Sequence, residues 1–295
     1  MTGAEQGFLL LTGQLGNPCR KVLTVPQMRI LGQRVRTMEH PDVQRELEER
    51  DLLDLGYGKE MAQRILALLE ERELLEYYVL QGKKKGCVPL TRVTAGYPLE
   101  VRQKLGDESP GCLWAKGDLS LLKMSKIALV GSRDIKEANR EFAEAVGFQA
   151  ARQGFALVSG NARGSDKTAQ EACLAAGGKV ISVVADQLAA QPERENVLYL
   201  SEDGFDLSFS AQRAISRNRC VHALAEKTFV AQCGYQTGGT WDGTVKNLRF
   251  GWSSVFCFRD GTAAQGLLEQ MGARGIALHQ LADLASLEDT EIRLF

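Results

Sequence analysis

The spacing of apolar residues changes once along the chain, and this change divides the chain into two parts. From Phe8 to about Leu80, apolar residues recur every three or four positions, as in VPQMRILGQRV and MAQRILALLEERELLEYYVL, which is the pattern of amphipathic helices. Glycines, prolines and three successive lysines in QGKKKGCVPL interrupt this pattern. We therefore predict an all-helical domain over residues 1–86 and a second domain over residues 87–295.

Short apolar runs alternate with amphipathic stretches from Lys126 onward. The runs KIALVG, FALVSG, KVISVVA, KTFVAQ and SSVFCF predict five buried strands, and KEANREFAEAVGFQAARQG and DKTAQEACLAAGG predict helices after the first two. Such alternation is typical of βαβ units, so we expect an α/β fold with a mostly parallel sheet. Near the C-terminus, AAQGLLEQMG and HQLADLASLED predict two further helices.

The composition of the chain excludes some classes of site and of protein but identifies none. The formal net charge of -1 leaves nucleic-acid binding undecided, because a local basic face can lie on a neutral chain. The seven cysteines form no CxxC pair and the three histidines stand far apart, so we expect no disulfide framework and no metal site. We also expect no cofactor. No apolar stretch approaches the roughly 18 residues of a membrane span, and we expect a cytoplasmic protein.

The loops that leave the predicted strands carry the candidate chemistry, because ligands of open parallel sheets bind at the carboxyl ends of strands. The first such loop is GSRD, with Gly131, Ser132 and Arg133. Gly131 allows a close turn, Ser132 can cap the next helix, and Arg133 beside the helix amides suits a phosphate. A helix cap followed by a surface arginine explains the same residues equally well.

The second loop is SGNARGSD, with Ser159, Gly160, Arg163 and Gly164. It follows the second strand and lacks the GxGxxG spacing, so it is not a dinucleotide fingerprint, and no P-loop motif is present. We interpret it as a general anion cradle. Asp166 fits the start of the following helix.

The third candidate is the run RAISRNRCVHALAEKTFVAQ, which places Arg217, Asn218 and Arg219 before a strand, with Arg213 close by. These cations could join the same edge of the sheet. The alternative is a solvated helix face whose arginines pair with Glu202 or Asp203.

A fourth loop, QTGGTWDGT, places Gly238, Gly239 and Thr240 after the predicted KTFVAQ strand. Adjacent glycines allow a backbone to approach a ligand, and Trp241 is either a stacking face or part of the core. The Gly-x-Gly turn at Gly56 and Gly58 lies between two predicted helices and fits either a phosphate contact or an ordinary helix turn. No catalytic constellation stands out, so we expect no enzyme.

These segments together resemble the DprA/Smf family of DNA-processing proteins. The resemblance runs from about Pro89 to Leu284 through GYPLEVRQKLGDESPGCLWAKGDLSLLKMSKIALVGSR, VSGNARGSDKTAQEACLAAGGKVISVV and RAISRNRCVHALAEKTFVAQ. It implies an extended Rossmann-like domain with helices on both faces of the sheet, preceded by a SAM-like, helix-hairpin-helix-like domain. It also implies a homodimer that binds single-stranded DNA and helps to load a RecA-type recombinase in natural transformation.

The resemblance assigns DNA phosphates to the GSR motif (131–133), the SG-x-A-x-G-x-D motif (159–166) and the RNR motif (217–219). Three departures from the family stand out: a short segment ADQLAAQPERENVLYLSEDGFD between strands, GGTWDGT in place of Ser-Gly-x-x-x-Thr-Ala, and an end without the winged-helix domain of many members.

A small-nucleotide sensor or a phosphoribohydrolase-like enzyme is the alternative, with a pocket built from Asp166, Gly238, Gly239 and Thr240. GGTWDGT is similar to the GG-x-GT phosphate loop of lysine-decarboxylase-like phosphoribohydrolases. The glutamate that normally follows that loop is absent, and Lys246 and Asn247 occupy its neighbourhood.

Overall fold

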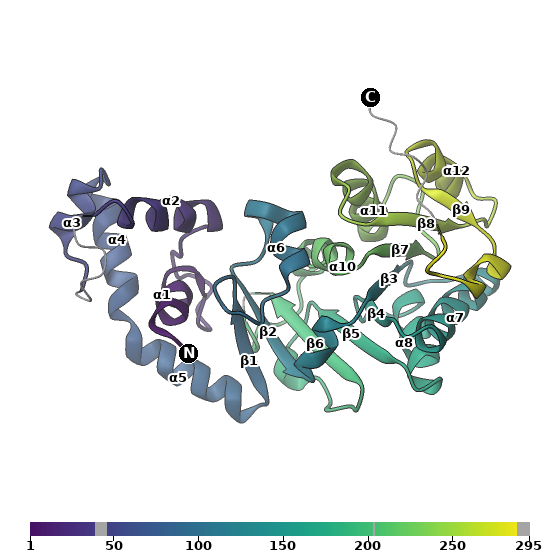
Figure 1. The fold of residues 1–295 in the computed structure, drawn as a ribbon, viewed down its shortest axis with the longest axis horizontal. Coiled ribbons are helices and arrows are strands. Elements are labelled where there is room, and N and C mark those ends of the chain that lie inside the picture. Colours follow the sequence, from purple (N-terminus) through teal and green to yellow (C-terminus); the bar gives the residue numbers. More distant parts are fainter. Residues whose placement is uncertain (39–45, 203, 288–295) are drawn as a thin grey trace.

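A computed structural model describes residues 1–38, 46–202 and 204–287 of the chain. Figure 1 shows a group of helices at the N-terminal end and a long twisted sheet with helices packed on it. The N-terminal helices are α1 (Gly3–Thr12), α2 (Val25–Val35), α3 (Glu49–Asp54), α4 (Lys59–Glu70) and α5 (Arg72–Lys84).

The predicted hairpin lies between α3 and α4. Gly56 has a positive φ of 81°, and Gly58 is the N-cap residue of α4. The continuous apolar pattern over residues 61–80 does not form one helix, because the backbone leaves the helical conformation at Glu71, where ψ is 37°. Part of the predicted segment VQRELEERDLLDLGYG lies outside the described residues, and α3 covers its centre.

Within the described residues the sheet has nine strands, in the order β1-β2-β6-β5-β4-β3-β7-β8-β9. Six of them, β5-β4-β3-β7-β8-β9, follow the Rossmann strand order 3-2-1-4-5-6 and are parallel. Strand β6 extends this sheet in parallel, and β2 and β1 then add antiparallel. The strands are β1 (Cys87–Thr91), β2 (Cys112–Gly117), β3 (Lys126–Val130), β4 (Ala156–Ser159), β5 (Lys179–Val184), β6 (Val197–Glu202), β7 (Lys227–Val230), β8 (Ser254–Phe258) and β9 (Arg274–Ile276).

Helices cover both faces of the sheet, as expected. Side chains alternate along each strand, so Ile127 and Leu129 of β3 pack in one core, and Ala128 and Val130 pack in the other. The first core contains α7 (Glu137–Arg152) and α8 (Ser165–Ala175), and the second contains α6 (Leu99–Leu105), α10 (Asn218–Leu224), α11 (Gly239–Phe250) and α12 (Ala263–Gln270). The short helix α9 (Ala211–Ser216) precedes α10.

All five predicted strands are present, as β3, β4, β5, β7 and β8, but the other four strands were not predicted. Pro89 breaks the strand signal of β1, which is tolerated because β1 is an edge strand. Buried charged residues, Lys116 in β2 and Glu202 in β6, stand at the ends of the short apolar runs CLWA and VLYL of those two strands. The short segment ADQLAAQPERENVLYLSEDGFD, which departs from the family pattern, therefore contains β6.

The predicted helix over HQLADLASLED is wrong. Up to residue 287, where the described part of this segment stops, a short 3-10 helix, Leu278–Ala282, is the helical structure that forms. The side chain of Gln153 bonds Leu281 O, Ala282 O and Leu284 N at 2.7 to 3.3 Å. These contacts replace the backbone bonds that would have continued a helix.

Candidate nucleic-acid interface

The predicted site segments meet at the carboxyl edge of the sheet, next to the point between β3 and β7 where the strand order reverses. This is where ligands of open α/β sheets bind. Ser132 donates two hydrogen bonds to Gln232 O, from its backbone N at 2.9 Å and from Oγ at 3.2 Å. Thr240 Oγ1, at the start of α11, donates to Gly131 O at 3.0 Å. The GSR loop is thus joined to the loop after β7 and to α11.

Gly131 is required by the close approach of α8. A Cβ at this position would lie 2.2 Å from Ser165 Oγ, and Ser165 donates to Ser132 O through both its N and its Oγ at 3.1 Å. Ser132 does not cap the helix that follows it: α7 begins at Glu137, with Lys136 at the N-cap. The predicted capping role is wrong because four residues of loop separate Ser132 from α7.

Asp166 holds the SGNARG loop in place. It lies in the first turn of α8, as predicted, and its Oδ2 accepts the backbone N–H of Gly160 at 3.1 Å and of Ala162 at 3.2 Å. Burial raises the pKa of the Asp166 carboxyl, while the charge of Arg217 and the two amides act in the opposite direction. These two loop amides are therefore bonded to the protein itself.

Arg217 lies beneath this loop and is only 7% exposed. Its Nη1 donates to Val183 O at 2.9 Å. The guanidinium occupies the place where any side chain at Gly160 would begin, since a Cβ there would come 1.4 Å from Nη1. Burial lowers the pKa of Arg217, and Asp166 opposes that shift. Gly160 therefore makes room for the Arg217 guanidinium, whose positive charge lies below the protein surface.

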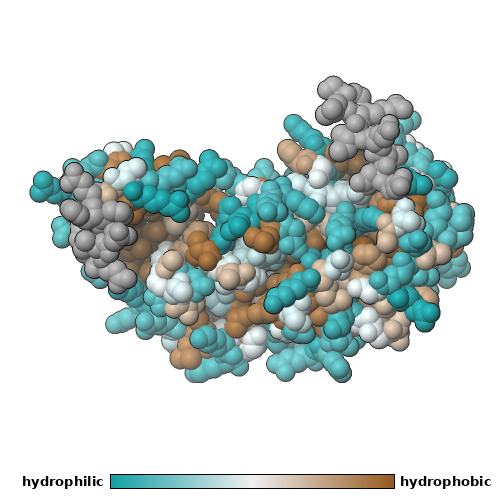
Figure 2. Space-filling model, in the orientation of Figure 1, coloured by the Kyte–Doolittle hydropathy of each residue, from teal (hydrophilic) through white to brown (hydrophobic). Residues whose placement is uncertain are grey.

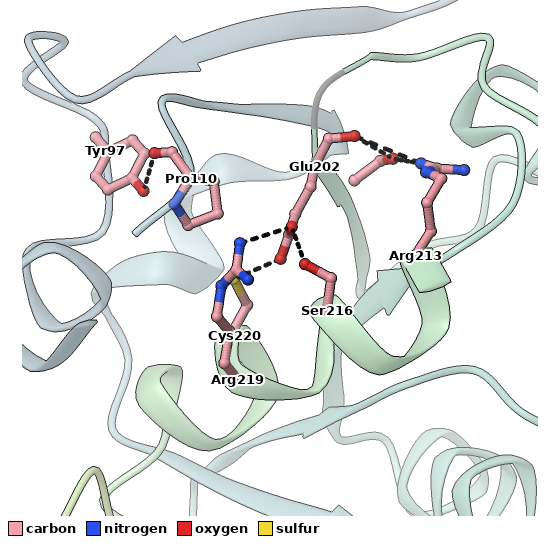
Figure 3. Close-up of polar contacts among 8 residues, drawn as sticks. Tyr97, Pro110, Glu202, Arg213, Ser216, Arg219 and Cys220 are labelled. Carbon is pink, nitrogen blue, oxygen red and sulfur yellow. Dashed lines mark hydrogen bonds and ion pairs between the residues drawn. The ribbon is translucent and has the colours of Figure 1, made fainter. Parts of the chain in front are cut away.

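Arg219 is paired with a buried carboxylate, as Figure 3 shows. Glu202, at the end of β6, is 6% exposed, and its Oε2 accepts bonds from Arg219 Nη2 at 3.1 Å and Ser216 Oγ at 3.0 Å. Cys220 Sγ donates to Oε1 at 3.1 Å. The predicted pairing of an arginine with Glu202 is thus confirmed for Arg219. The expectation that the pair lies on a solvated helix face is wrong, because both side chains are largely buried. Asp203 lies outside the described residues.

Arg213 fastens the segment that connects β6 to α9. Its Nη1 donates to the carbonyls of Ala185, Leu207 and Ser208 at 2.7 to 2.9 Å, and its Nη2 donates to Ser201 Oγ at 2.8 Å. The three arginines of the RAISRNR run therefore all bond groups of the protein itself and hold together the loops at this edge of the sheet.

Two arginines of the site remain on the surface. Arg133 is exposed, and its guanidinium carbon lies 5.9 Å from the ring centre of Phe209. Arg163 pairs with Asp134 at 2.6 Å, and both side chains are more than three-quarters exposed. Phe209 and Tyr235 are 56% and 55% exposed. Sequence reasoning missed both aromatics because single residues in loops carry no periodic signal.

The N-terminus of α11 completes the edge. Its N-cap is Gly238, with a φ of 88°, and the carbonyl of Gly239 accepts a bond from Asn218 Nδ2 at 3.0 Å. Trp241, 7% exposed, belongs to the core. Ser159 is fully buried, and its Oγ accepts a bond from Gln170. The structure therefore brings the GSR, SGNARG, RNR and GGT segments into contact, with Ser159 inside the protein.

Among the described residues, no group of three or more His, Cys, Asp or Glu side chains is placed to hold a metal ion. Within the same residues, every helix is too short or too polar to cross a membrane.

The sequence profile of the DNA recombination-mediator protein A family matches residues 89–245. The chain belongs to this family. It is 32% identical to the DNA processing protein DprA of Streptococcus pneumoniae over 141 residues, which are 44% of this chain and 50% of that protein. It is 30% identical to DprA of Bacillus subtilis over 142 residues, 44% of this chain and 48% of that protein. The matches thus span about half the length of these curated relatives.

Solved structures of DprA proteins share the fold. The crystal structure of DprA from S. pneumoniae superposes with a TM-score of 0.72 at 24% identity, covering 98% of this chain and 100% of that chain. A structure that describes the single-stranded DNA binding mode of DprA from Helicobacter pylori superposes with a TM-score of 0.56 at 22% identity, covering 66% of this chain and 94% of that chain. The DprA/Smf resemblance and the extended Rossmann-like fold are both confirmed.

Proposed function

We propose that this DprA-family chain binds single-stranded DNA at the carboxyl edge of its sheet and acts in DNA processing and recombination. One observation carries the proposal: the exposed Arg133 guanidinium lies 5.9 Å from the exposed ring of Phe209, at the end of β3, where the strand order reverses. The H. pylori relative, whose structure describes binding of single-stranded DNA, supports it.

The arrangement suits single-stranded DNA better than a duplex. An exposed arginine can neutralise a phosphate, and an exposed aromatic ring can stack with a base, which is accessible only in a single strand. Arg133 and Arg163 provide exposed charge, and Phe209 and Tyr235 provide exposed rings. We therefore expect binding that is sensitive to salt and weakly selective for sequence.

Direct phosphate contacts by Arg217 and Arg219 stay predictions. In the structure their guanidiniums bond Val183 O and Glu202, so phosphate would have to compete with these internal partners. Asn218 and the backbone of Gly164 also stay predicted contacts, as does the predicted pocket at Asp166.

The test is a titration of a labelled single strand of about 20 nucleotides and its duplex, from about 50 to about 300 mM salt, followed by fluorescence anisotropy. We expect the single strand to bind more tightly than the duplex. Arg133→Ala should raise Kd about fivefold and lower the salt dependence by about one phosphate contact. Phe209→Ala should raise Kd about tenfold with the salt dependence unchanged, because stacking releases no counterions.

Arg152→Ala is the matched control. Arg152 is an exposed arginine at the C-terminal end of α7, and the N-terminal end of this helix follows the GSR loop. Arg152 is therefore far from the proposed DNA site, and its replacement should not change Kd. Wild-type protein that binds no DNA, or Arg133→Ala protein with wild-type affinity and salt dependence, would refute the proposal.

A small nucleotide is the second candidate ligand, because the N-terminus of α11 lies next to Gly131 and helix N-termini bind phosphate. A panel of mononucleotides, tested by thermal shift beside the DNA titration, separates the two candidates. A nucleotide that raises Tm, together with a DNA titration that shows no binding, would favour the small-nucleotide ligand. Loading of a RecA-type recombinase, a role in transformation, the homodimer, cytoplasmic residence and the absence of enzymatic activity stay predictions.

A further inference from the structure

Three arginines from separate parts of the chain lie where the N-terminal helices meet the sheet. Arg29 is on α2, Arg92 directly follows β1, and Arg102 is on α6. In Figure 1, α2 and α6 lie next to each other, and α2 contacts the 3-10 helix Gly106–Glu108 that follows α6. Figure 2 shows mainly hydrophilic residues over α2 and α6. Positive charge from both parts of the chain is therefore gathered at this junction.

Contacts with the backbone and with one carboxylate hold these arginines in place. The backbone N of Arg92 donates to Gly111 O at 3.2 Å, and Arg102 Nη1 donates to Arg92 O at 3.4 Å. Arg29 Nη1 pairs with the Asp107 carboxylate at 3.1 Å. Within the described residues, Arg29 is the member of the three whose guanidinium has a carboxylate partner.

Arg92 is the least satisfied of the three arginines. Its Nη1 is buried and has no hydrogen-bond partner in the described part of the chain. Burial lowers the pKa of Arg92, and the positive charges of Arg102 and Arg29 lower it further. Tyr97 and Asp107 act on this pKa in the opposite direction. Because buried polar atoms of proteins are nearly always hydrogen-bonded, Nη1 points to an acceptor from outside the described chain.

We propose that Arg29, Arg92 and Arg102 form a phosphate-binding site at the junction of the N-terminal helices and the sheet. A phosphate group offers three strong acceptor oxygens, so it can bond three guanidiniums at once, whereas a carboxylate has only two oxygens. Arg29 and Arg102 are exposed and can bind the anion from the surface, while Arg92 binds it from below. Three positive charges beside one negative charge, that of Asp107, favour an anion here.

This site is separate from the carboxyl edge of the sheet that carries the GSR loop. Strand β1 is an edge strand, and β2, β6, β5 and β4 lie between it and β3. With neighbouring strands about 4.8 Å apart, about 24 Å separate β1 from β3. The inference therefore does not depend on DNA binding at the GSR loop. The bound phosphate belongs either to a DNA backbone or to a free phosphate compound, and the test separates these two sources.

Thermal unfolding of the full chain in about 1 to about 50 mM sodium phosphate, against sodium chloride of equal ionic strength, tests the site. Phosphate stabilises many folded proteins by its exclusion from their surface, so the measure is the difference between wild type and variant. Arg92→Gln should remove most of the phosphate-dependent rise in Tm. Arg102→Gln should weaken phosphate binding about tenfold, as expected for the loss of a hydrogen bond to a charged group.

Arg152→Gln is the control. It replaces an exposed arginine at the end of α7, so its Tm should respond to phosphate as that of wild type does. The readout is the response to phosphate and not the Tm without phosphate, so a variant of altered stability still tests the site. Arg92→Gln and Arg102→Gln proteins that both respond like wild type would overturn the proposal.

The source of the phosphate is identified by repeating the DNA titration with Arg92→Gln. A salt dependence lower by about one phosphate contact assigns the site to a DNA phosphate. Unchanged DNA binding, together with a lost Tm response, assigns it to a free phosphate compound. A chain that binds no DNA at all would refute the proposed function, whereas the Tm response would still decide whether this site exists.

Discussion

His222 shows what one buried side chain contributes in this protein. It is 1% exposed, and its Nδ1 lies 3.2 Å from Asn247 Nδ2 and 3.3 Å from Thr228 Oγ1. Asn247 is fully buried and also bonds Ser253. Asn247, which lies near the place where the phosphoribohydrolase-like alternative would have a glutamate, is therefore part of a buried polar network that supports α11.

The stability of the fold should depend on pH through His222. Burial lowers its pKa from 6.5 to about 3, so between these values the unfolded chain binds a proton that the folded chain does not. Stability is therefore lost as pH falls below about 6.5, by about 2 kcal/mol between pH 7 and pH 5 from this group alone. Urea unfolding at pH 7 and at pH 5 measures this loss. His222→Gln should lose about 2 kcal/mol less stability than wild type between the two pH values, whatever its stability at pH 7.

A His222→Gln variant whose stability falls as much as that of wild type between the two pH values would contradict this assignment. Carboxylates are common to both proteins, so the comparison isolates the histidine.

Helices α7 and α8 illustrate what periodicity predicts about an element and what it omits. Both helices were predicted from the spacing of their apolar residues, and both are present. Their close packing was not predicted. It depends on Gly147, where a Cβ would lie 2.1 Å from the backbone oxygen of Ala169, an atom that cannot move without shifting α8.

Gly147→Ala should lower the free energy of unfolding by about 2 kcal/mol or more, because the overpacking cost exceeds the gain in helix propensity. Gly266→Ala in α12 is the matched control. It has nothing within 4 Å of its added Cβ, so it should raise stability by up to about 1 kcal/mol. Urea denaturation measures both, and equal effects of the two substitutions would show that α7 and α8 can separate without cost.

At the scale of the whole molecule, helices α1 and α5 pack in the core on one face of the sheet, while a smaller cluster is formed by the N-terminal part alone. The Tyr78 ring lies 5.4 Å from that of Trp114 and 4.7 Å from that of Phe205, and Tyr78 Oη donates to Asp206 at 2.6 Å. Helix α5 ends at Lys84 and β1 begins at Cys87. A domain boundary at residues 86 and 87 stays a prediction, and a shared core argues that the two parts fold together.

We expect the two parts to unfold in one transition. All three tryptophans lie beyond residue 86; Trp114 touches Tyr78 of α5, so in a Trp114→Phe background the fluorescence of Trp241 and Trp252 reports on the sheet part. Cys19 is the exposed thiol of the N-terminal helices, and a dye attached to it in a Cys233→Ser background reports on those helices. The two urea curves should coincide. A separate, earlier transition of the Cys19 dye would instead support two independently folding domains.

The order of short apolar runs and amphipathic stretches was enough to predict the α/β class, the five central strands and the helices α7, α8 and α12, because periodicity reflects burial directly. The motifs placed 131–133, 159–166 and 238–240 after those strands and 217–219 before the KTFVAQ strand. Tertiary structure alone decided which charges stay outside. Arg133 remains exposed, whereas Arg217 and Arg219 are held by Val183 O and Glu202. Such partners are distant in sequence, and burial is a property of the packed chain, so a local pattern of residues cannot contain them.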